Sequence, residues 1–375
     1  MLKKSICIAA LLLLTLPLSG CWDNVVIEEN TIITSIGIDE TEPNEEPGKS
    51  PHKYIFVTVG SFNDKDKGDF TTVEADILSE ALIKGNNRSV HPLRSAKLHS
   101  IVFNRQAAEH GYIPLVDTHK LEEVNRFLPD YMVSNTDALE IFNTLGKMGL
   151  QEKALTYLTD LVNGAAKSGY CPDISTYDFN LDFLSKGPDP MLPLLDIKND
   201  TIFVKGTALF ANDKMVGELT ATESVFLNLI RNNKSSFSYY ILFPLQDAAF
   251  DDAIFQTHKC NAKISTETQG DDLIINIDLE VNGYFDKFVW GHLQKMMSYE
   301  EINSYIKNYF NTNAKEVFTV LQSYKSDPCN VKGILKMNDY SFYNTRDFAK
   351  VYQKAKVNVN TDLDITNSPN PKVTK

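Results

Sequence analysis

The sequence predicts an α+β protein with more than one domain, in which a mixed α/β region is followed by an antiparallel sheet covered by a long helix. Strand-like and helix-like stretches alternate between residues 31 and 163, as they do in a mixed α/β layer. Near the C-terminus, two stretches that alternate apolar and polar residues enclose one long amphipathic helix. The chain has 375 residues and 43% hydrophobic content, which is enough to bury more than one core.

The first 20 residues have the three parts of a bacterial lipoprotein signal peptide. Lys3 and Lys4 form a positive start, residues 6–16 are apolar, and Leu18-Ser-Gly lies just before Cys21. The apolar stretch is only about half as long as the ~20 residues that a membrane-spanning helix needs. We therefore expect cleavage after residue 20 and a diacylglycerol on the thiol of Cys21, which would hold the mature chain to membrane lipid. The alternative is a plain secretory signal that ends near a cysteine by chance.

The next stretches predict two paired strands and a helix. Residues 31–39 and 54–62 are rich in β-branched residues, and an acidic loop that contains two prolines separates them. Thr71, with Glu74 three residues later, has the sequence of a capping box. We therefore expect a helix that begins at Thr71 and ends at Gly85.

Residues 98–163 continue the alternation up to a proline-rich boundary. The predicted elements are a strand at 98–103, helices at 104–111 and 121–128, a strand at 131–134, and helices at 136–146 and 151–163. Three prolines then fall within six residues, which predicts a domain boundary between residues 185 and 200. The predicted organisation is a signal peptide at 1–20, a mixed α/β region at 21–190 that can divide into two domains, and an α+β region at 200–375.

The region after the boundary begins with a predicted hairpin and helix. Residues 201–210 and 214–217 flank the pair Asn212-Asp213, a combination that is typical of a turn. Thr220, with Glu223 three residues later, has the sequence of a capping box and predicts the N-terminus of the next helix.

The last hundred residues predict the sheet and its covering helix. Residues 273–281 alternate apolar and polar side chains, which indicates a strand with one buried face. A long amphipathic helix is expected to begin after Ser298, because Glu301 completes a capping box. A helix at 344–355 leads into residues 357–365, which repeat the alternation. We expect this last strand to join the same antiparallel sheet.

The residues contain no motif of a known catalytic or cofactor site. Walker, dinucleotide-binding, HExxH and Gly-x-Ser-x-Gly sequences are absent from the 375 residues. The loop 63–69 resembles a calcium loop only faintly, since its acids are out of step with its glycine, and we expect no metal there. His258 and Cys260 are a close His/Cys pair, but residues two apart in a strand share a face for structural reasons. Trp290, with nearby phenylalanines, is expected to anchor the long helix and not to line a pocket.

Charge and cysteine content exclude further classes of protein. The net charge is −12, and it becomes −14 without residues 1–20, which contain two lysines and no acid. A nucleic-acid-binding surface requires clustered positive charge, so we expect no nucleic-acid partner. Cys171, Cys260 and Cys329 are widely spaced and odd in number, which does not fit a disulfide framework or a zinc site. We expect them to be buried as small hydrophobic residues.

Short motifs in a fixed order resemble the Ger(x)C lipoproteins, the C subunits of spore germinant receptors. The motifs are Gly20-Cys-Trp-Asp23, Gly37-Ile-Asp39, Lys97-Leu-His-Ser-Ile-Val-Phe103, Ala107-Ala108 with Gly111, Gly206-Thr-Ala-Leu-Phe210, Asp213-Lys214, Val216-Gly-Glu-Leu219, Glu223-Ser224 and Ser326-Asp327. The resemblance covers essentially the full chain.

The resemblance implies a non-enzymatic lipoprotein of three domains, without cofactor, on the outer face of the spore inner membrane. It also implies two integral membrane partners, the A and B subunits of the receptor, and a role in nutrient-triggered germination. A different class, the substrate-binding lipoprotein of an ABC importer, remains the alternative. Such proteins are doubly wound in both lobes, whereas the C-terminal half here predicts antiparallel strands. A cell-wall hydrolase would need a nucleophile or metal site that the sequence does not suggest.

Overall fold

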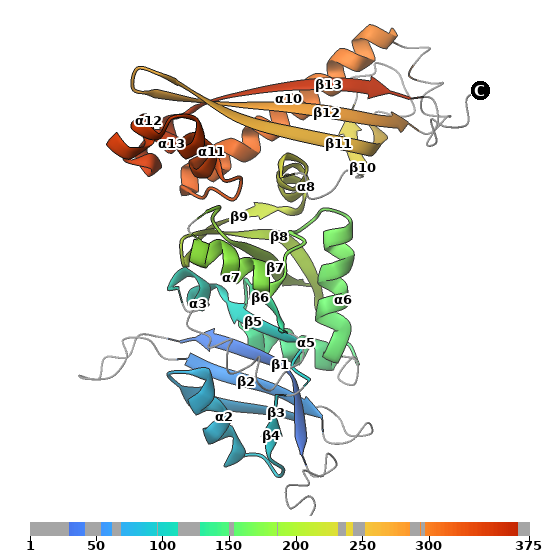
Figure 1. The fold of residues 1–375 in the computed structure, drawn as a ribbon. Helices are drawn as coiled ribbons and strands as arrows, with labels where there is room; N and C mark the ends of the chain where they lie inside the picture. The colour runs from blue at the N-terminus through green and yellow to red at the C-terminus, as the bar shows by residue number, and fades with distance from the viewer. Residues whose placement is uncertain are drawn as a thin grey trace, which may run out of the picture.

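The computed structural model describes residues 30–41, 54–61, 69–95, 97–111, 128–149, 154–185, 187–231, 238–242, 252–285, 293 and 297–366. These residues form two sheets, and helices pack on both of them (Figure 1). The strands of the larger sheet lie between residues 31 and 220, and those of the smaller sheet between residues 238 and 365. The α+β class with several domains is therefore confirmed.

Nine strands of the described residues form the larger sheet, in the order β3-β2-β1-β5-β6-β7-β8-β9, with β4 paired to β1. Their bounds are β1 (Thr31–Glu40), β2 (Tyr54–Ser61), β3 (Asp69–Ala75), β4 (Leu93–Arg94), β5 (Ser100–Asn104), β6 (Asp130–Ser134), β7 (Met191–Lys198), β8 (Thr201–Ala211) and β9 (Lys214–Thr220). The four central strands β1, β5, β6 and β7 run parallel to one another. Antiparallel strands extend the sheet on both sides.

Helices cover both faces of the larger sheet. One face carries α2 (Leu78–Asn86), α3 (Arg105–Glu109) and α7 (Thr176–Ser185), and the other carries α5 (Ala138–Lys147) and α6 (Ala154–Lys167). Successive side chains of a strand point to opposite faces. Accordingly, Phe103 in β5 joins the core with α2, α3 and α7, and its neighbour Val102 joins the core with α5 and α6. Each face of the central strands is therefore buried.

The prediction of a helix that begins at Thr71 is wrong, because residues 69–75 form strand β3. Val73 pairs with Phe56 of β2, and Ala75 pairs with Tyr54. Val73 and Ala75 are buried while Thr72 and Glu74 are exposed, which is the period of two that a strand requires. The helix begins only at Leu78. The capping-box sequence is therefore coincidental here, and pairing with β2 decides the conformation.

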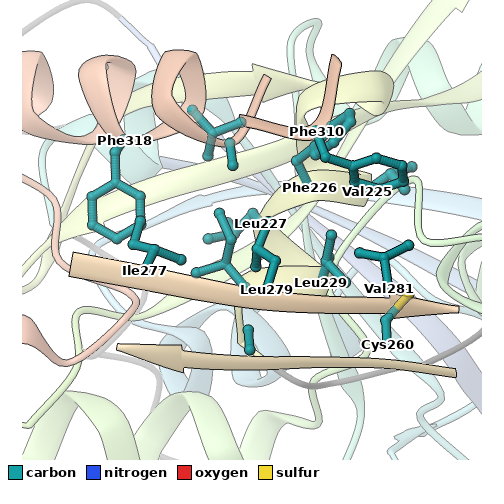
Figure 2. Close-up of a cluster of buried hydrophobic side chains, with 14 of the residues drawn as sticks. Val225, Phe226, Leu227, Leu229, Cys260, Ile277, Leu279, Val281, Phe310 and Phe318 are labelled. Carbon is teal, nitrogen blue, oxygen red and sulfur yellow. The ribbon is translucent and has the colours of Figure 1, made fainter. Parts of the chain in front are cut away.

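The smaller sheet has the order β10-β11-β12-β13. Its strands are β10 (Ser238–Leu242), β11 (Asp252–Gln269), β12 (Asp272–Phe285) and β13 (Lys356–Ile365). Helix α10 (Tyr299–Tyr324) covers the sheet, and α11 (Val331–Asn338), α12 (Tyr340–Thr345) and α13 (Phe348–Lys354) lead back to β13. Phe310 and Phe318 of α10 share one core with Ile277 and Leu279 of β12, and Phe318 lies beside Ile277 (Figure 2). The predicted long covering helix is confirmed.

The expectation that the last strand joins an antiparallel sheet is only partly right. Strands β10, β11 and β12 are antiparallel, but β13 runs parallel to β12, with Ile274 opposite Lys356 and Gly283 opposite Ile365. The cause is the helical crossover between the two strands. Because α10 runs back along the sheet, the chain begins β13 beside the start of β12, as in a strand-helix-strand unit.

Local signals in the C-terminal half predicted several other elements correctly. Thr220 caps α8 (Ala221–Ile230) and Ser298 caps α10, each in a capping box with a glutamate. The hairpin of β8 and β9 turns at Asn212, whose φ of 57° is tolerated by asparagine. Residues 121–127 of the helix predicted at 121–128 lie outside the described residues.

The larger sheet continues across the predicted domain boundary. Strand β7 lies between residues 185 and 200 and pairs with both β6 and β8, although Pro193 interrupts its run of amide donors. The two halves also share a core, since Met191, Leu209 and Leu219 of the larger sheet pack with residues of α8, α10 and the smaller sheet. Helix α8 is buried from Ser224 to Ile230 and lies between the sheets (Figures 1 and 2). The division at residues 190–200 stays a prediction.

Candidate functional site

The predicted acylation site, Cys21, lies outside the described residues, as do Trp290 and residues 63–68. What the structure describes is the folded body that follows the predicted anchor. Within that body, no group of three His, Cys, Asp or Glu side chains could hold a metal ion. Among the helices it describes, none combines the length and the apolar character needed to span a bilayer.

His258 and Cys260 lie in β11, but they do not form a reactive pair. The register of β11 against β12 shifts between Thr257 and Lys259, so His258 occupies a β-bulge. The Cys260 side chain points into the apolar core, and burial raises the pKa of its thiol to about 11. A thiol with that pKa is neutral at pH 7 and is a poor nucleophile. The arrangement therefore has a structural explanation.

The other two cysteines are also buried, as expected. Cys171 donates a weak hydrogen bond from Sγ to the carbonyl oxygen of Val162, at 3.7 Å. Burial raises the pKa of the Cys329 thiol to about 12. The cysteines of the described body thus act as small apolar residues.

Polar residues gather at the carboxyl ends of the parallel strands, where open α/β sheets commonly bind ligands. Asp39 at the end of β1 accepts hydrogen bonds from the backbone N–H groups of Ala138 and Leu139, at 2.6 and 3.1 Å. It thereby caps the N-terminus of α5. Burial raises the Asp39 pKa to about 6, although these hydrogen bonds oppose the shift. Asn104 at the end of β5 donates to the Glu40 carbonyl oxygen and accepts from the Glu40 N–H.

A second polar group continues along the same edge of the sheet. Arg105 forms an ion pair with Glu218 of β9 and donates to Asn135 Oδ1. Lys205 Nζ lies 2.6 Å from Glu218, and Asn135 donates to Asp196 at 2.8 Å. These side chains satisfy one another and tie β6, β7, β8, β9 and α3 together. These contacts form a structural polar network, and at the same edge His110 Nδ1 lies 2.7 Å from Oε1 of the buried Glu40.

The half-buried Asp189 and the buried Asp327 join the larger sheet to the end of helix α10. The Asp189 carboxylate accepts a hydrogen bond from the Asp327 N–H at 2.8 Å, and the Asp189 N–H donates to the Asp327 carbonyl oxygen at 2.9 Å. Asp327 in turn accepts from the N–H groups of Val331 and Lys332, at the N-terminus of α11. Burial raises the Asp327 pKa to about 7, and the negative charge of Asp189 adds to the shift.

Neighbouring contacts complete this junction. Ser326 donates to the Phe210 carbonyl oxygen at 2.6 Å, and the Tyr352 hydroxyl donates to the Ser326 carbonyl oxygen at 3.0 Å. Gly217 of β9 lies against the ring of Tyr324, so closely that an added Cβ would come within about 2.5 Å of the ring carbons. Only glycine fits at this contact between the larger sheet and α10.

A partly open cavity of about 440 Å³ lies beside the junction. Its lining contains three acidic and three basic side chains, namely Asp189, Asp327, Asp347, Lys325, Lys332 and Arg346. The positive charge of Lys332 favours the ionised form of both Asp189 and Asp327. The opposing charges therefore balance within the cavity, and no nucleophile and base are paired there.

Residues of the sequence motifs occupy these two regions. Asp39 and Glu218 belong to the polar edge of the sheet, whereas Gly217, Ser326 and Asp327 belong to the junction. Sequence reasoning missed Asp189 and Tyr352, because their partners lie 138 and 26 residues away and no local pattern marks such pairs. The motifs thus mark places where distant parts of the chain are held together.

Comparisons with known proteins agree with this architecture. Residues 23–197 match the family model described as "Spore germination protein N-terminal domain", and residues 205–368 match "Spore germination B3/ GerAC like, C-terminal". The "Spore germination protein GerQC" of Bacillus cereus is 20% identical over 367 residues, which cover 95% of this chain and 97% of the relative. Both family models describe spore germination proteins, which leaves the importer alternative without support.

A solved structure shows the same fold. The chain in "Crystal Structure of the GerBC protein" superposes with a TM-score of 0.56 at 13% sequence identity, over 88% of this chain and 97% of that one. At this identity the likeness concerns the fold alone. The two family models together span nearly all of the described body, and this protein therefore belongs to the Ger(x)C family of spore germination proteins.

Proposed function

We propose that this protein is a lipid-anchored, non-enzymatic subunit of a spore germinant receptor and acts by holding its partner subunits. The observation that carries the proposal is the match of both family models, in order, directly after the predicted lipoprotein signal peptide. The expected partners are the integral membrane A and B subunits. The expected place is the outer face of the spore inner membrane.

The chemistry of the described body supports a role without catalysis. Its cysteines are buried with raised pKa values or apolar surroundings, and the carboxylates of Asp39 and Asp327 accept backbone hydrogen bonds. Groups that serve as helix caps and junction contacts are committed to structure. Function then depends on intact surfaces and not on one reactive side chain.

Replacing the predicted acylation site tests the anchor. The variant Cys21→Ala should remain unprocessed and should not incorporate a labelled fatty acid, because the thiol accepts the diacylglycerol. Spores that carry this variant should lose the response to one class of nutrient, while germination triggered downstream of the receptors should persist. Fatty-acid label on the variant, or a normal nutrient response without attachment, would contradict the proposal.

A matched pair of variants tests the non-enzymatic role. His258→Ala and Cys260→Ala should leave the germination rate nearly unchanged when the protein level is normal, since neither group is poised for chemistry. Phe226→Asp should lower the levels of the receptor's other subunits together with its own, because an unpaired charge in a core destabilises the fold. A large loss of rate from either of the first two variants, at normal level and attachment, would point to catalysis.

A further inference from the structure

We propose that the end of the larger sheet formed by α2, the loop 87–92 and β4 is the surface that lies against the lipid bilayer. This inference rests on the proposed anchor at Cys21 and adds to it the orientation of the body. The residues that meet the lipid are Ile83 and Val90, through apolar contacts, and Lys84, Arg88, Arg94 and Lys97, through their positive charges.

The segment between Cys21 and Asn30, here called the tether, decides which end of the body lies near the predicted anchor. The described chain begins at Asn30, nine residues after Cys21, and nine residues reach at most about 30 Å. The Thr31 N–H donates to the Pro92 carbonyl oxygen at 2.9 Å, and Arg94 donates to Asn30 Oδ1 at 3.2 Å. The tether therefore joins the body directly beside the loop 87–92.

Two exposed aliphatic side chains lie on α2 and on the loop 87–92. Val90 is 91% exposed and Ile83 is 69% exposed, although both are aliphatic. The loop that presents Val90 is held in place, because Asn86 Oδ1 accepts from the Leu93 N–H at 2.7 Å and the Gly85 carbonyl oxygen accepts from the Ser89 N–H at 3.0 Å. Apolar side chains fixed at a protein surface gain by entering the acyl boundary of a bilayer.

The local charge is opposite to that of the whole protein. Residues 78–97 contain four lysines and arginines but a single acid, Glu80, in a chain whose net charge is −12. Lys84, Arg88, Arg94 and Lys97 are all exposed. Bilayers that contain anionic lipids attract such clusters, whereas the remaining acidic surface is repelled. The charge distribution therefore turns this end of the body toward the membrane.

The shape of the molecule fits this orientation. Helix α2 and β4 lie at one end of the body, and the smaller sheet with α10 lies at the opposite end (Figure 1). With the first end on the lipid, the smaller sheet and helices α10 to α13 point away from the bilayer. A surface that is both apolar and basic suits a bilayer with anionic lipid, because the acyl boundary takes up the aliphatic side chains and the headgroups attract the cations.

Lipid-borne quenchers can test the contact on the intact, lipid-anchored chain. Val90→Cys provides a single accessible thiol for a fluorophore, since Cys171, Cys260 and Cys329 are buried. The labelled chain is reconstituted into vesicles that contain anionic lipid and lipids with brominated acyl chains. We expect strong quenching at position 90. The matched control is Met337→Cys on α11, a residue that is 78% exposed at the far end, and it should show little quenching.

Charge removal tests the electrostatic part of the contact. Each cation near an anionic surface favours the docked state about fivefold, so Lys84→Gln combined with Lys97→Gln should lower the docked-to-undocked ratio about 25-fold. Quenching at position 90 should fall to the level seen in purely zwitterionic vesicles. The control, Lys147→Gln combined with Lys350→Gln, removes two exposed cations elsewhere and should change nothing.

Flotation with the vesicles separates this inference from the proposed anchor. A chain that floats but shows equal quenching at both positions, or none at position 90, would overturn the orientation and leave the anchor standing. A chain that does not float would refute the anchor and the inference with it. Position 90 could instead become shielded only when other receptor subunits are present, with or without anionic lipid. That result would assign this surface to a protein partner and overturn the lipid contact.

Discussion

The substitution Phe226→Ala should destabilise the core that α8 shares with the smaller sheet. The Phe226 side chain is 1% exposed, and its ring centroid lies 5.3 Å from that of Tyr239 and 5.8 Å from those of Tyr309 and Phe310. Truncating a buried phenylalanine to alanine costs about 3–5 kcal/mol. Each aromatic pair adds about 0.5–1.5 kcal/mol beyond the buried area. With three rings around it, we expect a loss near the upper limit, about 4–5 kcal/mol.

Urea denaturation followed by circular dichroism measures this loss. A whole domain is stable by about 5–15 kcal/mol, so the variant should unfold at a far lower urea concentration than the wild-type protein. Leu181→Ala on α7 is the control, because Leu181 is half exposed and its truncation should change the unfolding free energy by less than about 0.5 kcal/mol. A loss below about 1 kcal/mol for Phe226→Ala would refute the assignment of this ring to the centre of a shared core.

Three further predictions concern the junction and the polar edge. Gly217→Val should destabilise the contact of β9 with Tyr324 by about 1–3 kcal/mol, as overpacking does, and limited proteolysis should then cut between the two sheets more readily than in the wild-type protein. The Asp327 pKa is raised from 3.8 to about 7 in the folded state, so the folded protein binds the proton more tightly than the unfolded chain does. The free energy of unfolding should therefore fall as the pH rises from about 4 to 7, by an amount on the order of a few kcal/mol. Urea midpoints measured across this range should decline, and Asp327→Asn should flatten the decline; an unchanged slope in that variant would contradict the assignment. Asp39→Ala should cost about 1–2 kcal/mol through loss of the α5 cap, and thermal melts of the variant at pH 8 would check this value.

Local sequence signals predicted the elements whose conformation is decided locally. The capping boxes at Ser298 and Thr220 are present as expected, because each depends on residues only three apart. The same signal at Thr71 failed, since pairing with β2 overrides a helix start in that stretch. The direction of β13 was missed for a related reason. It depends on where α10 returns the chain, which no alternation of side chains encodes.

The contacts that hold the candidate sites together could not be predicted from the sequence. Asp39 caps a helix 99 residues further along the chain, and Asp189 bonds a residue 138 positions away. Both aspartates were visible as acidic residues near strands, but neither their burial nor their partners follow from spacing. The sequence showed that Asp39 and Asp327 belong to motifs. Their hydrogen-bond partners, and so their structural roles, could be assigned only from the fold.

The core shared by the two sheets gives the molecule the character of a stiff spacer. Met191, Leu209 and Leu219 of the larger sheet pack in the same core as the α10 side chains. The hydrogen bonds between Asp189 and Asp327 add a polar contact between the two parts. Bending at this point would expose buried apolar surface, which costs about 25 cal/mol per Å². A body that resists bending keeps its two ends at a constant separation. A protein that binds the smaller sheet would therefore be held at a fixed distance from the point of attachment. A force applied to one end would be transmitted to the other, because no hinge lies between them in the described residues.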